Sequence, residues 1–297
     1  MRCACIDIGS NTTRLLVADV LVGGAAATVP ALAPVVERRA FTQLGRACRA
    51  GEALPAATRE ALAAVVAAQA QEARTLGAEA LRVVATAALR RSGDGLATCH
   101  ALAAAAGAPV ELLSEHDEAR LAFAGATCGL TDAPSGSIAV VDVGGGSAQI
   151  VVGSCDSGPA WSVSLPLGSG DLTTAHVQGD PPASKELTRL HTVAEDALAG
   201  VAPPPVTRAL AVGGSATSLR RLAGPVLEPA ALERVLATLV AAPSAQLAER
   251  LRVAPERARL LPAGIVVLMA VARRTGPLEV ARGGLREGIL HELASAL

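Results

Sequence analysis

The chain has 297 residues, which suits two domains of ordinary size, and 51% of them are hydrophobic, enough for two cores. Aromatic residues make up only 1%, and the formal net charge is −1, so neither stacking platforms nor a basic field for nucleic acid is expected. No apolar run reaches the roughly 18 residues that a membrane span needs.

The first half predicts strands and helices in the order β-β-β-α-β-α. Strands are expected at 5–10, 14–20, 33–43, 80–86 and 110–113, and helices at 55–76, 94–106 and 114–127. Ser114, with Asp117 three residues later, predicts a capped start for the last of these helices.

A polar, turn-rich break at 131–137 predicts a domain boundary, which divides the chain into residues 1–130 and 131–297. The second half restarts the pattern. Strands are expected at 138–143, 148–153, 160–166 and 208–212, and helices at 184–200, 229–252, 255–274 and 283–296. The repeated order indicates a mixed α/β arrangement with a duplicated core.

Six cysteines occur without a Cys-x-x-Cys pair, so buried free thiols in a reducing compartment are expected rather than zinc ligands or disulfides. The first predicted strand follows Met1 almost at once. This leaves no room for a signal peptide, and a cytoplasmic location is expected.

Two segments, 5–17 and 140–152, have the same pattern in the same register. Each is an apolar run ending in an aspartate, then a turn of glycine and small polar residues, then a second apolar run, which predicts a hairpin. The turn residues are Gly9, Ser10, Asn11 and Thr12 in the first segment, and Gly144, Gly145, Gly146 and Ser147 in the second. Glycine lets the backbone approach a ligand closely, and successive N–H groups in such a turn bind anions.

Asp7 and Asp142 stand just before the two turns. A carboxylate beside a bound phosphate would repel it, so the pattern indicates a bridging Mg²⁺. Two such turns facing each other across a cleft would bind a phosphate chain or a nucleotide. A pair of ordinary hairpins with glycine turns is the alternative, which the repetition in register disfavours.

Six segments in order resemble the exopolyphosphatase / guanosine pentaphosphate phosphatase (Ppx/GppA) family, a branch of the sugar kinase–actin–Hsp70 superfamily. Besides the two turn segments, the motifs lie at 86–90, 114–121, 211–217 and 285–290. The resemblance covers essentially the whole chain. It implies a duplicated actin-like (ribonuclease H-like) fold of two domains with an interdomain cleft.

The resemblance also implies roles for individual residues. Glu118 stands where the family has the base that activates water, with a solvated helix face as the alternative. Arg90 is expected to bind phosphate, with a surface cation as the alternative, and Arg120 is expected to form a salt bridge. The third glycine motif adds three expected phosphate-binding residues, Gly213, Gly214 and Ser215.

The chain departs from the family pattern at three places. Gln149 stands where the family has a glutamate that helps to hold Mg²⁺; an amide oxygen is a weaker ligand, so metal affinity or turnover is expected to be reduced. Asp7, Asp142 and Gln149 are the expected metal ligands. Arg259 replaces a family aspartate, and Glu115 replaces a family glycine before Glu118.

Together, the motifs and the resemblance predict a Mg²⁺-dependent exopolyphosphatase in which Glu118 directs water at the terminal phosphate. Inorganic polyphosphate or guanosine pentaphosphate is the expected partner and a homodimer the expected assembly, with no role for nucleic acid or a membrane. The alternatives are a guanosine pentaphosphate phosphohydrolase, a sugar- or acetate-kinase-like phosphotransferase in which the 213–215 motif serves an adenosine, and a catalytically weak phosphate or nucleotide sensor.

Overall fold

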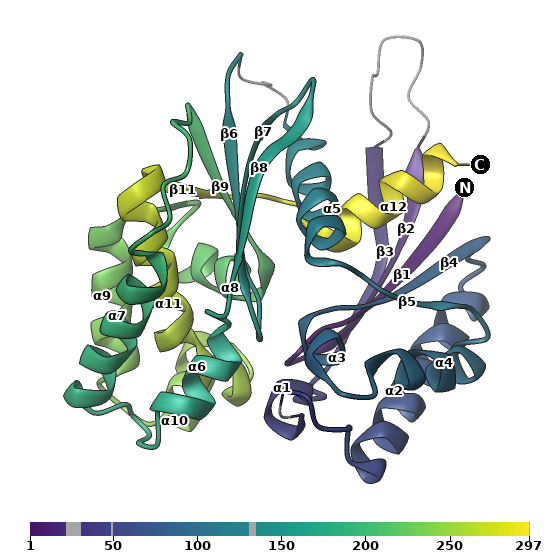
Figure 1. Cartoon of the computed structure of the whole chain (residues 1–297), viewed down its shortest axis with the longest axis horizontal. Helices are drawn as coiled ribbons and strands as arrows, with labels where there is room; N and C mark the ends of the chain where they lie inside the picture. The colour runs from purple at the N-terminus through teal and green to yellow at the C-terminus, as the bar shows by residue number, and fades with distance from the viewer. Residues whose placement is uncertain (22–30, 49, 131–134, 297) are drawn as a thin grey trace. The chain divides into compact units, whose positions relative to one another are not determined.

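The structure, a computed structural model, describes residues 1–21, 31–48, 50–130 and 135–296. The chain divides into two compact units: Met1–Thr131 with Gly283–Leu297 is unit 1, and Asp132–Arg282 is unit 2. Each unit is built around one β-sheet with helices packed against it (Figure 1). Among the described helices, none is both long and apolar enough to cross a membrane.

The sheet of unit 1 has the strand order β3-β2-β1-β4-β5. Its strands are β1 (Arg2–Ile8), β2 (Thr13–Leu21), β3 (Ala31–Ala40), β4 (Ala80–Ala85) and β5 (Val110–Leu112). β1 and β2 form an antiparallel hairpin that β3 extends, whereas β4 and β5 run parallel to β1. β1 is buried on both faces, which explains its near-continuous apolar sequence.

Helices cover both faces of this sheet. They are α1 (Leu44–Ala47), α2 (Ala56–Thr75), α3 (Ala87–Arg91), α4 (Gly95–Ala106), α5 (Glu115–Thr127) and α12 (Leu285–Ser295). On one face Ile6 of β1 shares a buried cluster with Val66 of α2. On the other face Leu16 of β2 shares a cluster with Leu121 of α5 and Ile289 of α12.

The C-terminal helix α12 belongs to unit 1, so the expected domain of residues 131–297 is wrong at its C-terminal end. Glycines allow α5 and α12 to meet backbone to backbone. A Cβ on Gly125 would lie 1.9 Å from Gly284 O, and one on Gly288 would lie 2.0 Å from Leu121 O. The sequence predicts the helix from its own periodicity, but that periodicity does not indicate which sheet the apolar face covers.

Ion pairs add to this packing of α12. The carboxylate of Glu292 accepts hydrogen bonds from Arg82 of β4 at 2.5 Å and from Arg120 of α5 at 2.6 Å. The expected salt bridge of Arg120 is therefore confirmed. It joins residues 172 positions apart in the sequence, and it fixes α12 to both a strand and a helix of unit 1.

We expect Glu292→Gln to lower the melting temperature above pH 4.5, the usual pKa of glutamate, and to change it little in more acidic solution. Burial raises the pKa of Glu292, but the hydrogen bonds and charges of Arg120 and Arg82 outweigh this and hold the pKa below 4.5. A carboxylate with a depressed pKa stabilises the fold above its unfolded pKa, and this contribution is lost as the pH falls through the folded value. Melting curves of both proteins across this range test the expectation, and an equal difference at every pH would contradict it.

Unit 2 repeats the topology of unit 1, with the strand order β8-β7-β6-β9-β11-β10. Its strands are β6 (Ile138–Val143), β7 (Ala148–Ser154), β8 (Gly158–Leu165), β9 (Arg208–Val212), β10 (Val226–Leu227) and β11 (Leu278–Val280). β6 and β7 form an antiparallel hairpin that β8 extends, and β9 and β11 continue the sheet in parallel with β6. The predicted duplicated actin-like α/β fold is thus confirmed at the level of each unit.

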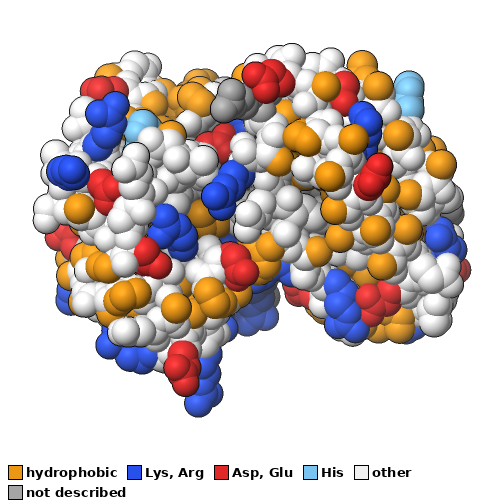
Figure 2. Space-filling view, turned by 90° about the horizontal axis from the view of Figure 1, so that it is seen from below, with side chains coloured by type: hydrophobic (Ala, Val, Ile, Leu, Met, Phe, Trp, Pro, Cys, Tyr) orange, Lys and Arg blue, Asp and Glu red, His pale blue; other side chains and the backbone are white. Residues whose placement is uncertain are grey.

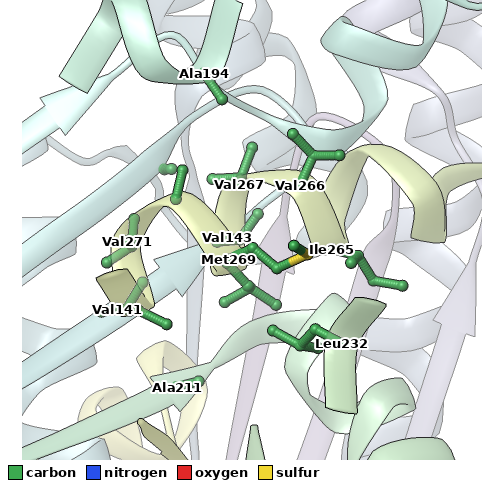
Figure 3. Close-up of a cluster of buried hydrophobic side chains, with 14 of the residues drawn as sticks. Val141, Val143, Ala194, Ala211, Leu232, Ile265, Val266, Val267, Met269 and Val271 are labelled. Carbon is green, nitrogen blue, oxygen red and sulfur yellow. The ribbon is translucent and has the colours of Figure 1, made fainter. Parts of the chain in front are cut away.

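The core of unit 2 is organised by one long apolar helix. The helices of this unit are α6 (Ser169–His176), α7 (Ser184–Leu198), α8 (Gly213–Ala223), α9 (Pro229–Leu239), α10 (Ser244–Leu251) and α11 (Pro255–Thr275). Residues of α11, among them Ile265 and Met269, share one buried cluster with Val141 and Val143 of β6 (Figure 3). This packing holds β6, and therefore the turn that follows it, in place.

Two local expectations need correction. The single helix expected at 229–252 is two helices, α9 and α10, because Pro243 disfavours helical backbone at the residue before it. The six cysteines, all of which the structure describes, are free as expected, but not all are buried: Cys128 is half-buried and Cys155 is exposed.

Candidate phosphate-binding site

The first turn, residues 9–12, joins β1 to β2. The strand register pairs Asp7 with Arg14, and Gly9 N donates a hydrogen bond to Thr12 O at 3.0 Å, which closes the turn. A Cβ on Gly9 would lie 3.1 Å from Thr12 O, so the close approach favours glycine. The predicted hairpin and its predicted turn residues are therefore confirmed as a structural element.

Backbone groups around α1 bind the carbonyls of this turn from one side. Gly45 N donates to Ser10 O at 2.7 Å, and Gln43 N donates to Asn11 O at 3.1 Å. The C=O and N–H groups of a trans peptide point in opposite directions. The N–H groups of Asn11 and Thr12 therefore point away from α1, as an anion-binding turn requires.

Side chains at the same turn also have unused hydrogen-bonding capacity. Within the described residues, Ser10 Oγ, Asn11 Nδ2 and Asp7 Oδ1 are buried and have no hydrogen-bond partner. An unsatisfied buried polar group costs about 1–3 kcal/mol, so the fold does not place such groups here for its own stability. The hydroxyl and the amide N–H₂ are donors that suit phosphate oxygens, and the carboxylate oxygen suits a cation.

The second turn, residues 144–147 between β6 and β7, repeats this arrangement. Gly144 N donates to Ser147 O at 3.0 Å. The N-terminus of α6 takes the place of α1: Ser169 N donates to Gly144 O and Gly170 N donates to Gly145 O, both at 2.9 Å. The duplication thus includes a helix behind each turn, which the hairpin pattern in the sequence does not reveal.

The third glycine motif lies beside the second turn in unit 2, where it begins α8 directly after β9. Gly213 has a φ of 86°, and a Cβ there would lie 2.5 Å from Asp142 Oδ1. A Cβ on Gly214 would lie 2.6 Å from Arg257 Nη2. Glycine at these positions lets a carboxylate and a guanidinium group lie directly against the start of the helix, and Ser215 is fully buried behind it.

The two predicted aspartate ligands, Asp7 and Asp142, lie at equivalent places in the two hairpins. Asp142 and Gln149 are paired across β6 and β7, and both amide atoms of Gln149 are buried without a hydrogen-bond partner in the described chain. Burial raises the pKa of Asp7, and the charges of Arg14 and Arg286 act in the opposite direction. Each hairpin thus offers an oxygen ligand beside its turn.

This ligand set fits one class of metal ion. Among the described residues, no three His, Cys, Asp or Glu side chains are grouped closely enough to hold a metal by themselves. Mg²⁺ commonly binds through one or two carboxylates and completes its shell with water and phosphate oxygens. Asp142 with the buried oxygen of Gln149, or Asp7 in unit 1, fits that mode.

Glu118 and Arg90 form a direct ion pair in unit 1. Glu118 is only 9% exposed, and its Oε2 accepts a hydrogen bond from Arg90 Nη1 at 2.9 Å. Arg90 Nη1 also donates to Leu113 O at 2.8 Å, and Ser114 Oγ caps α5 by accepting from Asp117 N at 3.0 Å. These contacts fix the carboxylate and exclude the alternative of a solvated helix face for Glu118.

Three arginines at these turns received no role from the sequence: Arg14, Arg257 and Arg286. Arg286 at the start of α12 is buried, and its Nη2 lies 3.3 Å from Glu37 Oε2. Arg14 could have been found by aligning the two hairpins, because it occupies the position of Gln149. No local pattern marks Arg257, whereas Arg286 lies within the motif at 285–290 but received no role from it.

The charges elsewhere are mixed. On the face shown in Figure 2, Lys and Arg side chains are interspersed with Asp and Glu. This agrees with the net charge of −1. That the two turns confront each other across a cleft stays a prediction.

The comparisons with known proteins agree with the motifs. The model of the Ppx/GppA phosphatase family matches residues 22–296. Exopolyphosphatase 1 of Mycobacterium leprae is 27% identical over 98% of this chain and 88% of its own length. The guanosine-5'-triphosphate,3'-diphosphate pyrophosphatase of Aeromonas hydrophila is 26% identical over 98% of this chain and 59% of its own length. The crystal structure of the Aquifex aeolicus Ppx/GppA family member superimposes with a TM-score of 0.80 and 28% identity, covering 100% of this chain and 98% of that one.

Proposed function

Because the chain belongs to the Ppx/GppA phosphatase family, we propose that it is an exopolyphosphatase that removes the terminal phosphate of inorganic polyphosphate. The observation that carries the proposal is the pair of turns at 9–12 and 144–147. In each, a helix N-terminus or the residues leading into it bind the turn carbonyls, so that N–H groups point the other way. The first turn adds a buried hydroxyl and a buried amide that have no hydrogen-bond partner in the part of the chain that the structure describes.

In the proposed reaction, Glu118 accepts a proton from a water molecule as the water oxygen attacks the terminal phosphorus. The bond from that phosphorus to its bridging oxygen breaks, which releases orthophosphate and leaves a chain shorter by one phosphate. Arg90 holds Glu118 Oε2 and so orients the carboxylate. No covalent intermediate with the protein is needed, and a phosphate-binding role of Arg90 stays a prediction.

The charge that develops on the phosphoryl oxygens would be stabilised by the backbone N–H groups of the turns and by Ser10 and Asn11. Asp142 with Gln149, or Asp7 in unit 1, would hold Mg²⁺, which would supply charge neutralisation of the phosphates. The N–H groups of the third motif at 213–215 would bind further phosphate oxygens at the start of α8.

Hydrolysis of guanosine pentaphosphate is the second candidate. The name of the relative from Aeromonas hydrophila, a guanosine-5'-triphosphate,3'-diphosphate pyrophosphatase, supports it.

Measurements of phosphate release from long-chain polyphosphate and from guanosine pentaphosphate distinguish the two candidates. Both substrates are tested in the presence of Mg²⁺, first separately and then in competition with each other. Higher kcat/KM for polyphosphate is expected. Release from neither substrate by protein that binds both would overturn the proposal in favour of a sensor, and ADP-dependent phosphate transfer would favour a phosphotransferase.

We expect Gln149→Glu to lower the Mg²⁺ concentration needed for half-maximal activity by about tenfold, because a carboxylate is a stronger ligand for this hard cation than an amide. Without metal, the same variant should melt at a lower temperature, since it buries a charge where the wild type buries an amide. Gln149→Leu, which removes the oxygen, is the matched control and should raise the Mg²⁺ requirement. An unchanged requirement in both variants would show that residue 149 does not bind the metal.

A further inference from the structure

Three charged side chains stand in line across the sheet of unit 1. The register pairs Asp7 of β1 with Arg14 of β2, and Arg14 in turn with Arg39 of β3. Directly paired residues point to the same face of a sheet, so the three form one row on that face. The neighbouring pair on this face, Cys5 and Leu16, lies in the apolar cluster with α12, so the row marks the end of that cluster beside the first turn.

The row places two positive charges, those of Arg14 and Arg39, directly opposite each other on neighbouring strands. Such pairs are destabilising unless a counter-charge is present. The counter-charges beside Arg14 are its strand partner Asp7 and Glu37, whose Oε2 lies 4.0 Å from Arg14 Nη2. Among the described residues, Arg14 Nε is buried without a hydrogen-bond partner. The side chain of Arg39 forms no hydrogen bond or ion pair with any described residue, although the charge of Glu37 acts on it.

The electrostatics agree with this geometry. Burial, together with the charges of Arg286 and Arg39, lowers the pKa of Arg14 to about 10. Burial and the charge of Arg286 also lower the pKa of Arg39. The arginines therefore disfavour one another's charge in the folded chain, and an anion bound between them would remove that penalty.

The second hairpin shows that the turn itself does not require this row. In unit 2 the equivalent line across the sheet is Asp142, Gln149 and Ser164, which has no cation. The same backbone therefore carries two guanidinium groups in unit 1 and none in unit 2. The cationic row is a property added to the first hairpin.

We infer that Arg39, together with Arg14, binds the second or a later phosphate of a phosphate chain whose end lies in the turn at 9–12. A guanidinium group matches phosphate with two parallel, charge-assisted hydrogen bonds, and Arg39 is exposed and able to provide them. The site would thus select for a chain of linked phosphates over a single phosphate. The inference deepens the proposed function and relies on it for the identity of the chain.

Arg39→Ala tests the inference by calorimetric titration of the full-length protein in EDTA, with tripolyphosphate and orthophosphate as probes. We expect tripolyphosphate to bind about tenfold more weakly to the variant, and orthophosphate to bind unchanged. The unliganded variant should melt at the same or a higher temperature than the wild type, because a like-charge pair has been removed. Arg39→Lys should recover part of the affinity.

Arg38→Ala is the matched control. Arg38 is adjacent on β3, points to the opposite face and pairs with Glu72, Nη2 to Oε1 being 2.7 Å. This variant should bind tripolyphosphate as the wild type does. The inference would be overturned if Arg39→Ala and the wild type bound tripolyphosphate equally well, or if the variant lost affinity equally for both probes. Failure of the wild type to hydrolyse polyphosphate would remove the proposed function alone, since the readout here is binding.

Discussion

Glu118→Gln is expected to lower phosphate release from polyphosphate by about 10²–10⁴-fold, the range that a positioned general base contributes. The substitution keeps the size of the side chain and the hydrogen bond to Arg90, but the amide cannot accept the proton of the attacking water. The loss should appear in kcat. Tripolyphosphate binding should be retained, because no phosphate-binding group has been changed and one negative charge has been removed.

The matched control is Glu115→Gln, on the same helix and also near Arg90, whose Nη2 lies 3.8 Å from Glu115 Oε1. Glu115 is exposed, so its substitution should change kcat by less than about twofold, as for a solvated surface ion pair. Near wild-type turnover of Glu118→Gln with retained binding would assign the base elsewhere. Equal losses in both variants would point to the Arg90 ion pair rather than to proton transfer.

The features that local sequence could predict are those whose causes are local. Each hairpin follows from an apolar run, an aspartate and a glycine turn within about thirteen residues, and the start of α5 follows from Ser114 and Asp117. The pairing of Glu118 with Arg90 joins residues 28 positions apart on two helices. The sequence could suggest it only through resemblance, because no spacing rule connects the two segments.

The features that the sequence could not predict depend on packing between distant segments. The place of α12 is set by glycine contacts and by the ion pairs of Glu292, all of which involve α5 or β4. The helices behind the turns were missed for a related reason: α1 is one turn long, and α6 begins with Ser169 and Gly170, which favour turns by propensity. The role of these two helices is to provide backbone N–H donors for the turn carbonyls, and this contact exists only in the folded structure.

The duplication also explains how one scaffold serves two purposes. Both units hold a turn between two strands and brace it from behind with backbone N–H groups. The residues in line with each aspartate across the sheet differ between the units. They are Arg14 and Arg39 beside Asp7, and Gln149 and Ser164 beside Asp142. On the proposal above, the first hairpin is specialised for phosphate charge, and the second has neutral side chains in line with the carboxylate that binds a cation.

Gly125→Ala is expected to destabilise unit 1 by about 3 kcal/mol or more, at the upper end of the cost of overpacking. A Cβ at this position would lie 1.9 Å from Gly284 O and 2.5 Å from Gly288 N, both of which are backbone atoms that no rotamer change can move. The start of α12 would have to separate from α5. That movement would displace Arg286 from the surroundings of Asp7 and would disturb the helix that carries Glu118.

Gly129→Ala is the matched control, two residues beyond the end of α5, because a Cβ there would meet no atom within 4 Å. The free energy of unfolding from denaturant titrations should fall in Gly125→Ala and change by less than about 0.5 kcal/mol in Gly129→Ala. A truncation before Gly284 should lose stability at least as great as Gly125→Ala, since it removes the whole contact. Wild-type stability of Gly125→Ala would show that α5 and α12 do not meet at these glycines, and the assignment of the C-terminal helix to unit 1 would then be wrong.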